Sequence, residues 1–173
     1  TDELGRDVLS RVLTGLQASM TVAVVSVACA AVVGTALGVM AGYRGGWLDT
    51  VVMRVVDVMF AFPVLLLAMA IVAVLGPGLA TTIAAISVVY VPIFARVARA
   101  STLAVREEPY VAVSRTMGTG TAYILARHVL PNITGPLIVQ TSLSLAFAIL
   151  SEAALSFLGL GIQPPQPSLG RMI

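Results

Sequence analysis

Lysine is absent from this sequence of 173 residues, and cysteine and histidine each occur only once. Without lysine the chain cannot form a phosphate-binding Walker A loop or a Schiff base with a substrate. Because Cys29 is the only cysteine, the chain cannot contain an internal disulfide framework. The net charge of +2 is too small to indicate nucleic acid as a partner. The composition thus excludes a Walker A ATPase site in this chain, and we also expect no catalytic residues and no metal site.

Charge is also scarce. Charged residues make up 10% of the chain and hydrophobic residues 58%, whereas globular proteins carry about 25% charged residues. Such a chain cannot cover a water-facing surface, so the composition indicates a membrane protein. Spans in lipid must pair their backbone groups internally, which favours helices. The predicted fold class is therefore all-α, a polytopic transmembrane helical bundle in one domain over 1–173.

Four stretches are apolar enough for the roughly 20 residues that a helix needs to cross the hydrocarbon core. The sequence Gly-Pro-Gly at 76–78 is a strong turn signal and separates the second stretch from the third. Pro63 is expected to kink the second helix, because it removes one backbone hydrogen bond. The predicted spans are 17–42, 56–75, 79–99 and 133–157.

Arginine is distributed unevenly between the predicted loops. With four spans, the loops at 44–57 and 96–128 lie on the same side, and together they hold seven of the ten arginines. The turn at 76–78 on the opposite side holds none. Because short arginine-rich loops stay in the cytoplasm, we predict that both loops are cytoplasmic.

Small residues recur every fourth position in the first span. In lipid, such a stripe lets two helix backbones approach closely. We expect it to pack inside the bundle, and the alternative is a direct role in lining a path. The stripe consists of Ser26, Ala30, Gly34, Gly38 and Gly42.

Charged residues also occur at or near the ends of the predicted spans. Arg54 and Asp57 are three residues apart, a spacing that makes them neighbours on a helix, so we expect them to pair. Glu152 lies near the end of the fourth span and must face protein or water. Two interpretations stay open for Glu152: a structural hydrogen bond or a place on a polar substrate route.

The segment 104–131 combines charge, glycine and proline. Pro109 follows two glutamates, which suits the first turn of a helix. Tyr110, Val113 and Met117 would share one face of that helix, and Gly118 and Gly120 would end it. A second helical pattern then runs to Pro131. The pattern predicts a compact helix–turn–helix loop that projects from the membrane.

This loop resembles the cytoplasmic signature of ABC importer permeases, written E-A-A, three residues, G, nine residues, I, one residue, L-P. Gly118, Leu130 and Pro131 match the signature. His128 stands at the isoleucine position. The three E-A-A positions are occupied by Ala112, Val113 and Ser114.

The flanking strings strengthen this resemblance. They are "TDELGRDVLSRVLTG" near the start, "EEPYV" with "RHVLPN" around the loop, and "SEAALSFLGLGIQPPQPSLG" near the end. Together they resemble the peptide/nickel importer permeases, most of all the C-type subunit of dipeptide and oligopeptide systems. Such permeases have the type I importer architecture with a further span at each end, so the resemblance implies that this chain is a fragment without its first and last spans.

The resemblance implies a transport subunit rather than an enzyme. In that family the loop is a coupling helix that inserts into a separate cytoplasmic ATPase, which uses ATP and Mg²⁺, while the permease binds no cofactor. The implied partners are two ATPase subunits, a second permease, an extracytoplasmic peptide-binding protein and the lipid of a bacterial cytoplasmic membrane. The implied coupling residues are Glu108, Tyr110, Val111, Ala112, Val113, Ser114, Arg115, Met117, Gly118, Leu130 and Pro131.

Three other functions stay open at this point. The same family also imports nickel and other small solutes, and the external binding protein largely selects the cargo. An ion- or proton-coupled transporter needs paired ionisable groups near the middle of the membrane, where this sequence has only peripheral ones. A membrane scaffold without transport activity would not depend on the turn at Gly118.

Overall fold

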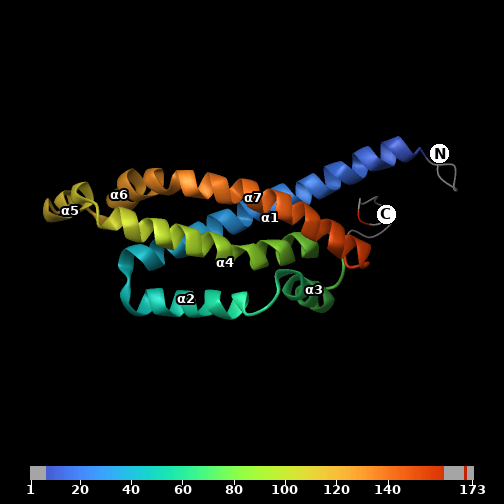
Figure 1. The fold of residues 1–173 in the computed structure, drawn as a ribbon, viewed down its shortest axis with the longest axis horizontal. Coiled ribbons are helices and arrows are strands. Elements are labelled where there is room, and N and C mark those ends of the chain that lie inside the picture. The colour runs from blue at the N-terminus through green and yellow to red at the C-terminus, as the bar shows by residue number, and fades with distance from the viewer. Residues whose placement is uncertain (1–6, 162–169, 171–173) are drawn as a thin grey trace. The chain divides into compact units, whose positions relative to one another are not determined.

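The computed structural model describes residues 7–161 and residue 170. These residues are almost entirely helical (Figure 1), and none of them is in a β-strand, which confirms the all-α prediction. The elements in chain order are α1 (Val8–Arg44), α2 (Gly46–Phe60), α3 (Val64–Leu75), α4 (Leu79–Arg106), α5 (Pro109–Thr116), α6 (Thr121–Ile124), the π-helical turn η1 (Leu125–Val129) and α7 (Leu130–Phe157).

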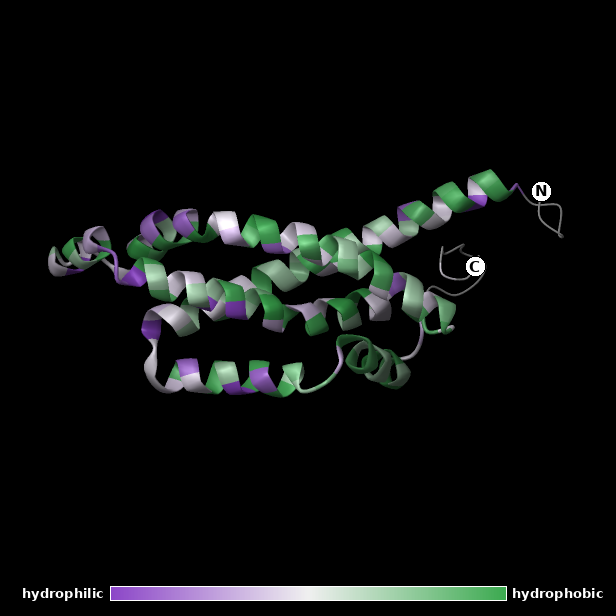
Figure 2. Ribbon diagram, in the orientation of Figure 1, coloured by the Kyte–Doolittle hydropathy of each residue, from purple (hydrophilic) through white to green (hydrophobic). Residues whose placement is uncertain are grey.

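Three helical stretches are long and apolar enough to cross a membrane: α1, α4 and the continuous run Thr121–Phe157. A fourth span results if α2 and α3 are counted as one broken pair. Figure 2 shows the difference within this pair, because α3 is hydrophobic along its length whereas α2 carries hydrophilic bands. The polytopic transmembrane architecture is thus confirmed.

The second predicted span, 56–75, is not one kinked helix. Helix α2 ends at Phe60, and Pro63 has the extended angles φ −56° and ψ 131° directly before α3 begins at Val64. Pro63 has no N–H to donate to the carbonyl of Met59, and its ring disfavours helical angles at Phe62. Pro63 therefore interrupts the second span as predicted, but more completely than by a kink: one helix ends before it and a new one begins after it.

The predicted loop 44–57 was wrong, because most of it is α2. Its valines recur at helical intervals, and Val56 is buried. Arg54 and Asp57, predicted to be neighbours on a helix, lie on the polar face of this amphipathic helix.

The other helices extend past the predicted spans. Helix α4 continues beyond residue 99 to Arg106. The last helical run begins at Thr121 rather than near 133, although Pro131 lies within it. A wide turn precedes this proline: in η1 the N–H of Leu130 bonds to the carbonyl of Leu125, five residues back. Such π-turns accommodate an irregular residue inside a helix.

The chain divides into two compact units; three of the divisions fall inside α1, α4 and α7, and one falls between α2 and α3. The first comprises 1–29, 62–89 and 143–173, and the second 30–61 and 90–142. The core of the first unit combines aliphatic side chains with buried hydroxyl-bearing ones. Its fully buried members include Val22, Ala23, Ser26, Val72, Thr82, Ile86, Leu155 and Ser156.

In the second unit, α1 and α4 pack backbone against backbone. A Cβ atom added at Gly34 would lie 2.6 Å from the carbonyl oxygen of Val91. One added at Gly38 would meet the carbonyl oxygen of Ala95, and one added at Gly42 would lie 2.9 Å from that of Arg99. Only glycine fits such a close approach. We call this contact the α1–α4 seam.

The other two members of the small-residue stripe are also buried. Ala30 in the second unit is 0% exposed. Ser26 in the first unit donates a hydrogen bond to the carbonyl of Ile83 at 3.2 Å. All five positions thus contact or approach protein, as packing inside a bundle requires.

Candidate functional site

Helix α5 is defined by a proline at its start and a glycine after its end. Glu108 precedes it with an extended backbone, and Pro109 occupies the first turn, where its missing N–H costs no hydrogen bond. After Met117, Gly118 has φ +77°. Its N–H bonds to the carbonyl of Arg115, and the next N–H, of Thr119, bonds to that of Ser114, both at 3.1 Å. This pair of bonds is a Schellman motif, which requires a left-handed residue.

The coupling segment is the name we use for α5, α6 and η1, which follow each other closely in the chain (Figure 1). Its apolar anchor is Val111, the one described residue of α5 that is buried. Val111 lies in a core cluster with Ile124, Val129 and Ile133. The segment is therefore seated on the second unit through few apolar side chains.

Two polar contacts add to this anchor. The Arg115 guanidinium lies over the ring of Tyr43 in α1, 5.3 Å from its centroid. The Oγ atom of Ser114 lies 3.3 Å from Nε2 of His128 in η1. Helix α5 is thus linked both to the end of α1 and to the start of the last helical run.

The opposite face of α5 is exposed and partly apolar. Tyr110 is 41% exposed, Val113 56% and Met117 78%. These are the three residues that the helical spacing placed on one face, and Ala112 beside them is exposed as well. Exposed apolar side chains grouped on one short helix are typical of a surface that docks with another protein.

The last two signature residues lie at the start of α7. Leu130 is 43% exposed and Pro131 is exposed, so neither belongs to the buried core. Their neighbours Val129 and Ile133 are fully buried in the cluster that also holds Val111. The last two signature residues thus lie next to the buried side chains through which the coupling segment packs on the rest of the second unit.

Arg106 connects the end of α4 to the end of α1. Its Nη1 atom donates to the carbonyls of Gly42 at 3.2 Å and Tyr43 at 3.4 Å, and its Nε donates to Glu107 at 3.0 Å. The last carbonyls of a helix have no partner within the helix, and a cation there is favourable. Arg106 thus caps α1 directly before the coupling segment begins.

Two ion pairs join α2 to α4. Arg99 binds the carboxylate of Asp49 through two bonds, of 2.5 Å and 2.6 Å. Arg96 binds Asp57 at 2.7 Å, so the prediction that Arg54 is the partner of Asp57 was wrong. The partners in each pair are at least 39 residues apart, and no local pattern could have indicated them.

Glu152 lies in the first unit and is completely buried. Its carboxylate accepts hydrogen bonds from Ser19 of α1 at 2.5 Å and from Ser156 of α7 at 2.7 Å. These contacts favour the structural interpretation of this residue, because hydrogen bonds from both helices surround the carboxylate. We call the three residues the Glu152 cluster.

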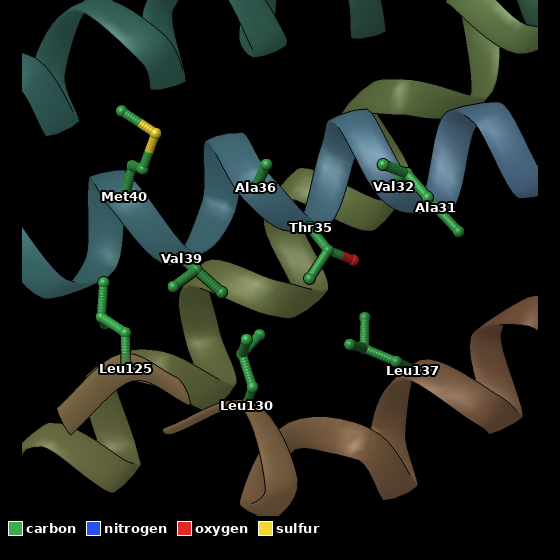
Figure 3. Close-up of a pocket in the computed structure, with 9 residues that line it drawn as sticks. All are labelled: Ala31, Val32, Thr35, Ala36, Val39, Met40, Leu125, Leu130 and Leu137. Carbon is green, nitrogen blue, oxygen red and sulfur yellow. The ribbon is translucent and has the colours of Figure 1, made fainter. Parts of the chain in front are cut away.

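An apolar groove of about 460 Å³ lies between α1 and the stretch from η1 into α7. Figure 3 shows Val39, Leu125 and Leu130 pointing into the space between these helices. Thr35 is the only polar side chain among the nine residues that line it: Ala31, Val32, Thr35, Ala36, Val39, Met40, Leu125, Leu130 and Leu137. A groove of this composition suits lipid or another apolar helix and offers no partner for a charged cargo.

The chain is similar in sequence and in fold to known membrane transport proteins. Residues 34–173 match the family described as "Binding-protein-dependent transport system inner membrane component". The chain is 44% identical over 173 residues to a dipeptide transport system permease protein of Alkalihalophilus pseudofirmus. It is 47% identical over 173 residues to a di/tripeptide transport system permease protein of Pseudomonas aeruginosa.

A glutathione transport system permease protein of Escherichia coli is 45% identical over 172 residues. These alignments cover 99% or more of this chain and 57% of each relative, so the chain spans little more than half their length. Among solved structures, an inward-facing methionine ABC transporter aligns with a TM-score of 0.75 and 21% identity, covering 88% of this chain and 76% of that chain. At this identity the likeness concerns the fold alone.

Proposed function

The chain belongs to the inner membrane components of binding-protein-dependent transport systems, and we propose that it moves short peptides inward across the cytoplasmic membrane. It would act as the transmembrane subunit of an ATP-driven importer. Three relatives with 44 to 47% identity carry names that refer to dipeptide, di/tripeptide and glutathione transport, which supports a peptide as the cargo.

One observation carries the coupling role: the exposed face of Tyr110, Val113 and Met117 on a helix anchored by a single buried valine. A helix held in this way presents apolar area to a partner and remains free to move with it. Helix-in-groove recognition uses such a face, with contacts at intervals of three and four residues. The partner we propose is a cytoplasmic ATPase subunit.

The proposed mechanism is mechanical rather than chemical. Two ATPase subunits bind and hydrolyse ATP with Mg²⁺, and their closure displaces α5. The displacement passes to α1 through Tyr43 and to the last helical run through His128, which α5 contacts through Arg115 and Ser114. A second permease subunit completes the path, and an external binding protein delivers the peptide.

The proposed orientation places the coupling segment in the cytoplasm. Seven of the ten arginines lie within 44–57 and 96–128, and arginine-rich connections are retained on the cytoplasmic side. Helices α2, α4 and α5 carry most of these arginines. The segment would then meet the ATPase directly below the membrane.

Uptake by the complete complex tests the proposal. The full-length permease is reconstituted with its partner subunits, and entry of a radiolabelled dipeptide into proteoliposomes is measured with ATP or with a proton gradient alone. We expect uptake with ATP and none with the gradient. Gradient-driven uptake without nucleotide would contradict the proposal. Uptake of Ni²⁺ but not of dipeptide would show that the cargo is a metal ion rather than a peptide.

Cross-linking tests separately whether the exposed face of Tyr110, Val113 and Met117, which we call the docking face, contacts the ATPase. Met117→Cys is made in a Cys29→Ala background, and Val74→Cys, 85% exposed on α3, serves as the matched control. We expect Met117→Cys to cross-link to an ATPase subunit and the control to yield no such product. If neither position cross-links to the ATPase, or if only Val74→Cys does, α5 is excluded as the docking helix.

A further inference from the structure

His128 is the point at which three parts of the coupling segment meet. It lies in η1, half-buried, and its ring contacts the rings of Tyr110 of α5 and Tyr123 of α6. The distances between ring centroids are 5.7 Å to Tyr110 and 6.0 Å to Tyr123, within the range of favourable aromatic pairs. Its Nε2 atom also reaches Ser114.

The direction of the Ser114–His128 hydrogen bond follows from the neighbouring contact. The Ser114 hydroxyl has one hydrogen, and it donates this hydrogen to the carbonyl of Tyr110 at 2.8 Å. Both contacts are satisfied together when the Oγ atom accepts a hydrogen bond from Nε2–H of His128 at 3.3 Å. An imidazole that donates here cannot be replaced by a purely apolar ring without loss of this bond.

The backbone around His128 is irregular in a way that determines where its side chain lies. In η1 the N–H of Leu130 bonds five residues back to Leu125, and Pro131 offers no N–H to the carbonyl of Arg127. The side chain of Asn132 donates to the carbonyl of His128 at 2.6 Å. A π-turn adds one residue to a helix and so rotates the preceding residues by roughly 100° about its axis.

We propose that His128 is a positioning residue that locks α5 to the start of α7, so that movement of α5 moves α7. The proposal rests on the coupling function proposed above. The reason lies in how little else holds α5: Val111 is its one buried residue among those described, and an apolar contact without direction lets a helix slide or rotate. The hydrogen bond from Nε2–H to Ser114 and the nearby rings of Tyr110 and Tyr123 add a directional link to the start of α7, as the contact of Arg115 with Tyr43 does to α1.

The experiment compares uptake with ATP hydrolysis in the complete reconstituted complex. His128→Phe keeps an aromatic ring next to Tyr110 and Tyr123 and removes the N–H, and Ser114→Ala removes the acceptor. His128→Gln restores a donor as the conservative variant. Ala126→Ser, at an exposed position of the same turn, is the matched control.

We expect both His128→Phe and Ser114→Ala to assemble, and His128→Phe to hydrolyse ATP at the rate of the unchanged protein. Dipeptide uptake per ATP should fall about tenfold, which corresponds to one hydrogen bond of about 1.4 kcal/mol. The double variant should be no worse than either single variant, because both remove the same bond. His128→Gln should recover most of the ratio of dipeptide uptake to ATP hydrolysis, and Ala126→Ser should not change this ratio.

Two results would overturn the proposal. One is an unchanged ratio of uptake to hydrolysis in His128→Phe. The other is a parallel loss of assembly, hydrolysis and uptake, which would make His128 a folding residue only. Failure of the coupling function itself would look different, because the unchanged protein would then show no ATP-dependent uptake.

Discussion

The α1–α4 seam and the coupling segment belong to the same unit but are built in opposite ways. In the seam, Gly34, Gly38 and Gly42 bring two helix backbones so close that no Cβ atom fits. In the coupling segment, α5 buries only Val111 among its described residues and leaves Tyr110 and Met117 exposed. Close packing of this kind resists deformation, whereas few buried contacts permit local movement. The difference indicates a rigid support next to a movable part.

The largest effect is expected at the centre of the seam. In Gly38→Ala the added Cβ would lie 2.8 Å from Cβ of Ala98 and 2.9 Å from the backbone nitrogen of Arg99. Because these atoms belong to a rigid helix, we expect the free energy of unfolding to fall by about 3 kcal/mol, the upper end of typical overpacking costs. This decrease can be measured by unfolding the full-length protein with sodium dodecyl sulfate.

Gly135→Ala is the matched control for this prediction. A Cβ at Gly135 in α7 meets nothing within 4 Å, and alanine stabilises a helix interior by up to about 1 kcal/mol relative to glycine. Equal stability of the two variants would show that the seam is not rigid.

A smaller effect is expected in the Glu152 cluster. Glu152→Leu removes the acceptor shared by Ser19 and Ser156, and loss of buried hydrogen bonds should cost about 1–3 kcal/mol. Glu152→Gln keeps an acceptor at this position without the charge, so we expect nearly unchanged stability and peptide uptake. If Glu152→Gln abolishes uptake while the protein stays folded, the charge serves the substrate route instead.

The two ion pairs between α2 and α4 should differ in strength. The Asp49 and Arg99 side chains are 19% and 32% exposed and form two bonds, whereas both Asp57 and Arg96 are more than half exposed. Double-mutant cycles with neutral amides should give a coupling of about 1.5 kcal/mol for the first pair. For the second, water-screened pair they should give about 0.2–1 kcal/mol. A stronger coupling for Asp57 and Arg96 would contradict this order.

The smallest effect on stability is expected at the docking face. Met117→Ala changes a side chain that is 78% exposed, so the free energy of unfolding should shift by less than about 0.5 kcal/mol. Binding of the ATPase should nevertheless weaken by about 1–2 kcal/mol if Met117 fills a pocket of the partner. Val74→Ala on α3, with 85% exposure, should change neither quantity. Unchanged ATPase affinity in Met117→Ala would remove this residue from the docking face.

Much of the coupling segment could be predicted because its signals are local. Pro109 favours a helix start and Gly118 favours a left-handed end, and both effects depend on the backbone of these residues alone. The helical spacing of Tyr110, Val113 and Met117 likewise indicated one face of α5. In contrast, the helix α2 was missed, because its charges were interpreted without the partners on α4 that neutralise them.

The sequence by itself determined that this chain is helical, that it spans a membrane and that a proline and a glycine delimit α5. These properties follow from composition, spacing and backbone preference, which act within a few residues. Only the tertiary structure decided that Asp57 pairs with Arg96, that Arg106 caps α1 and that His128 contacts the rings of Tyr110 and Tyr123. These contacts join residues on different helices or across a turn, and such meetings depend on how the helices pack, which no local pattern encodes.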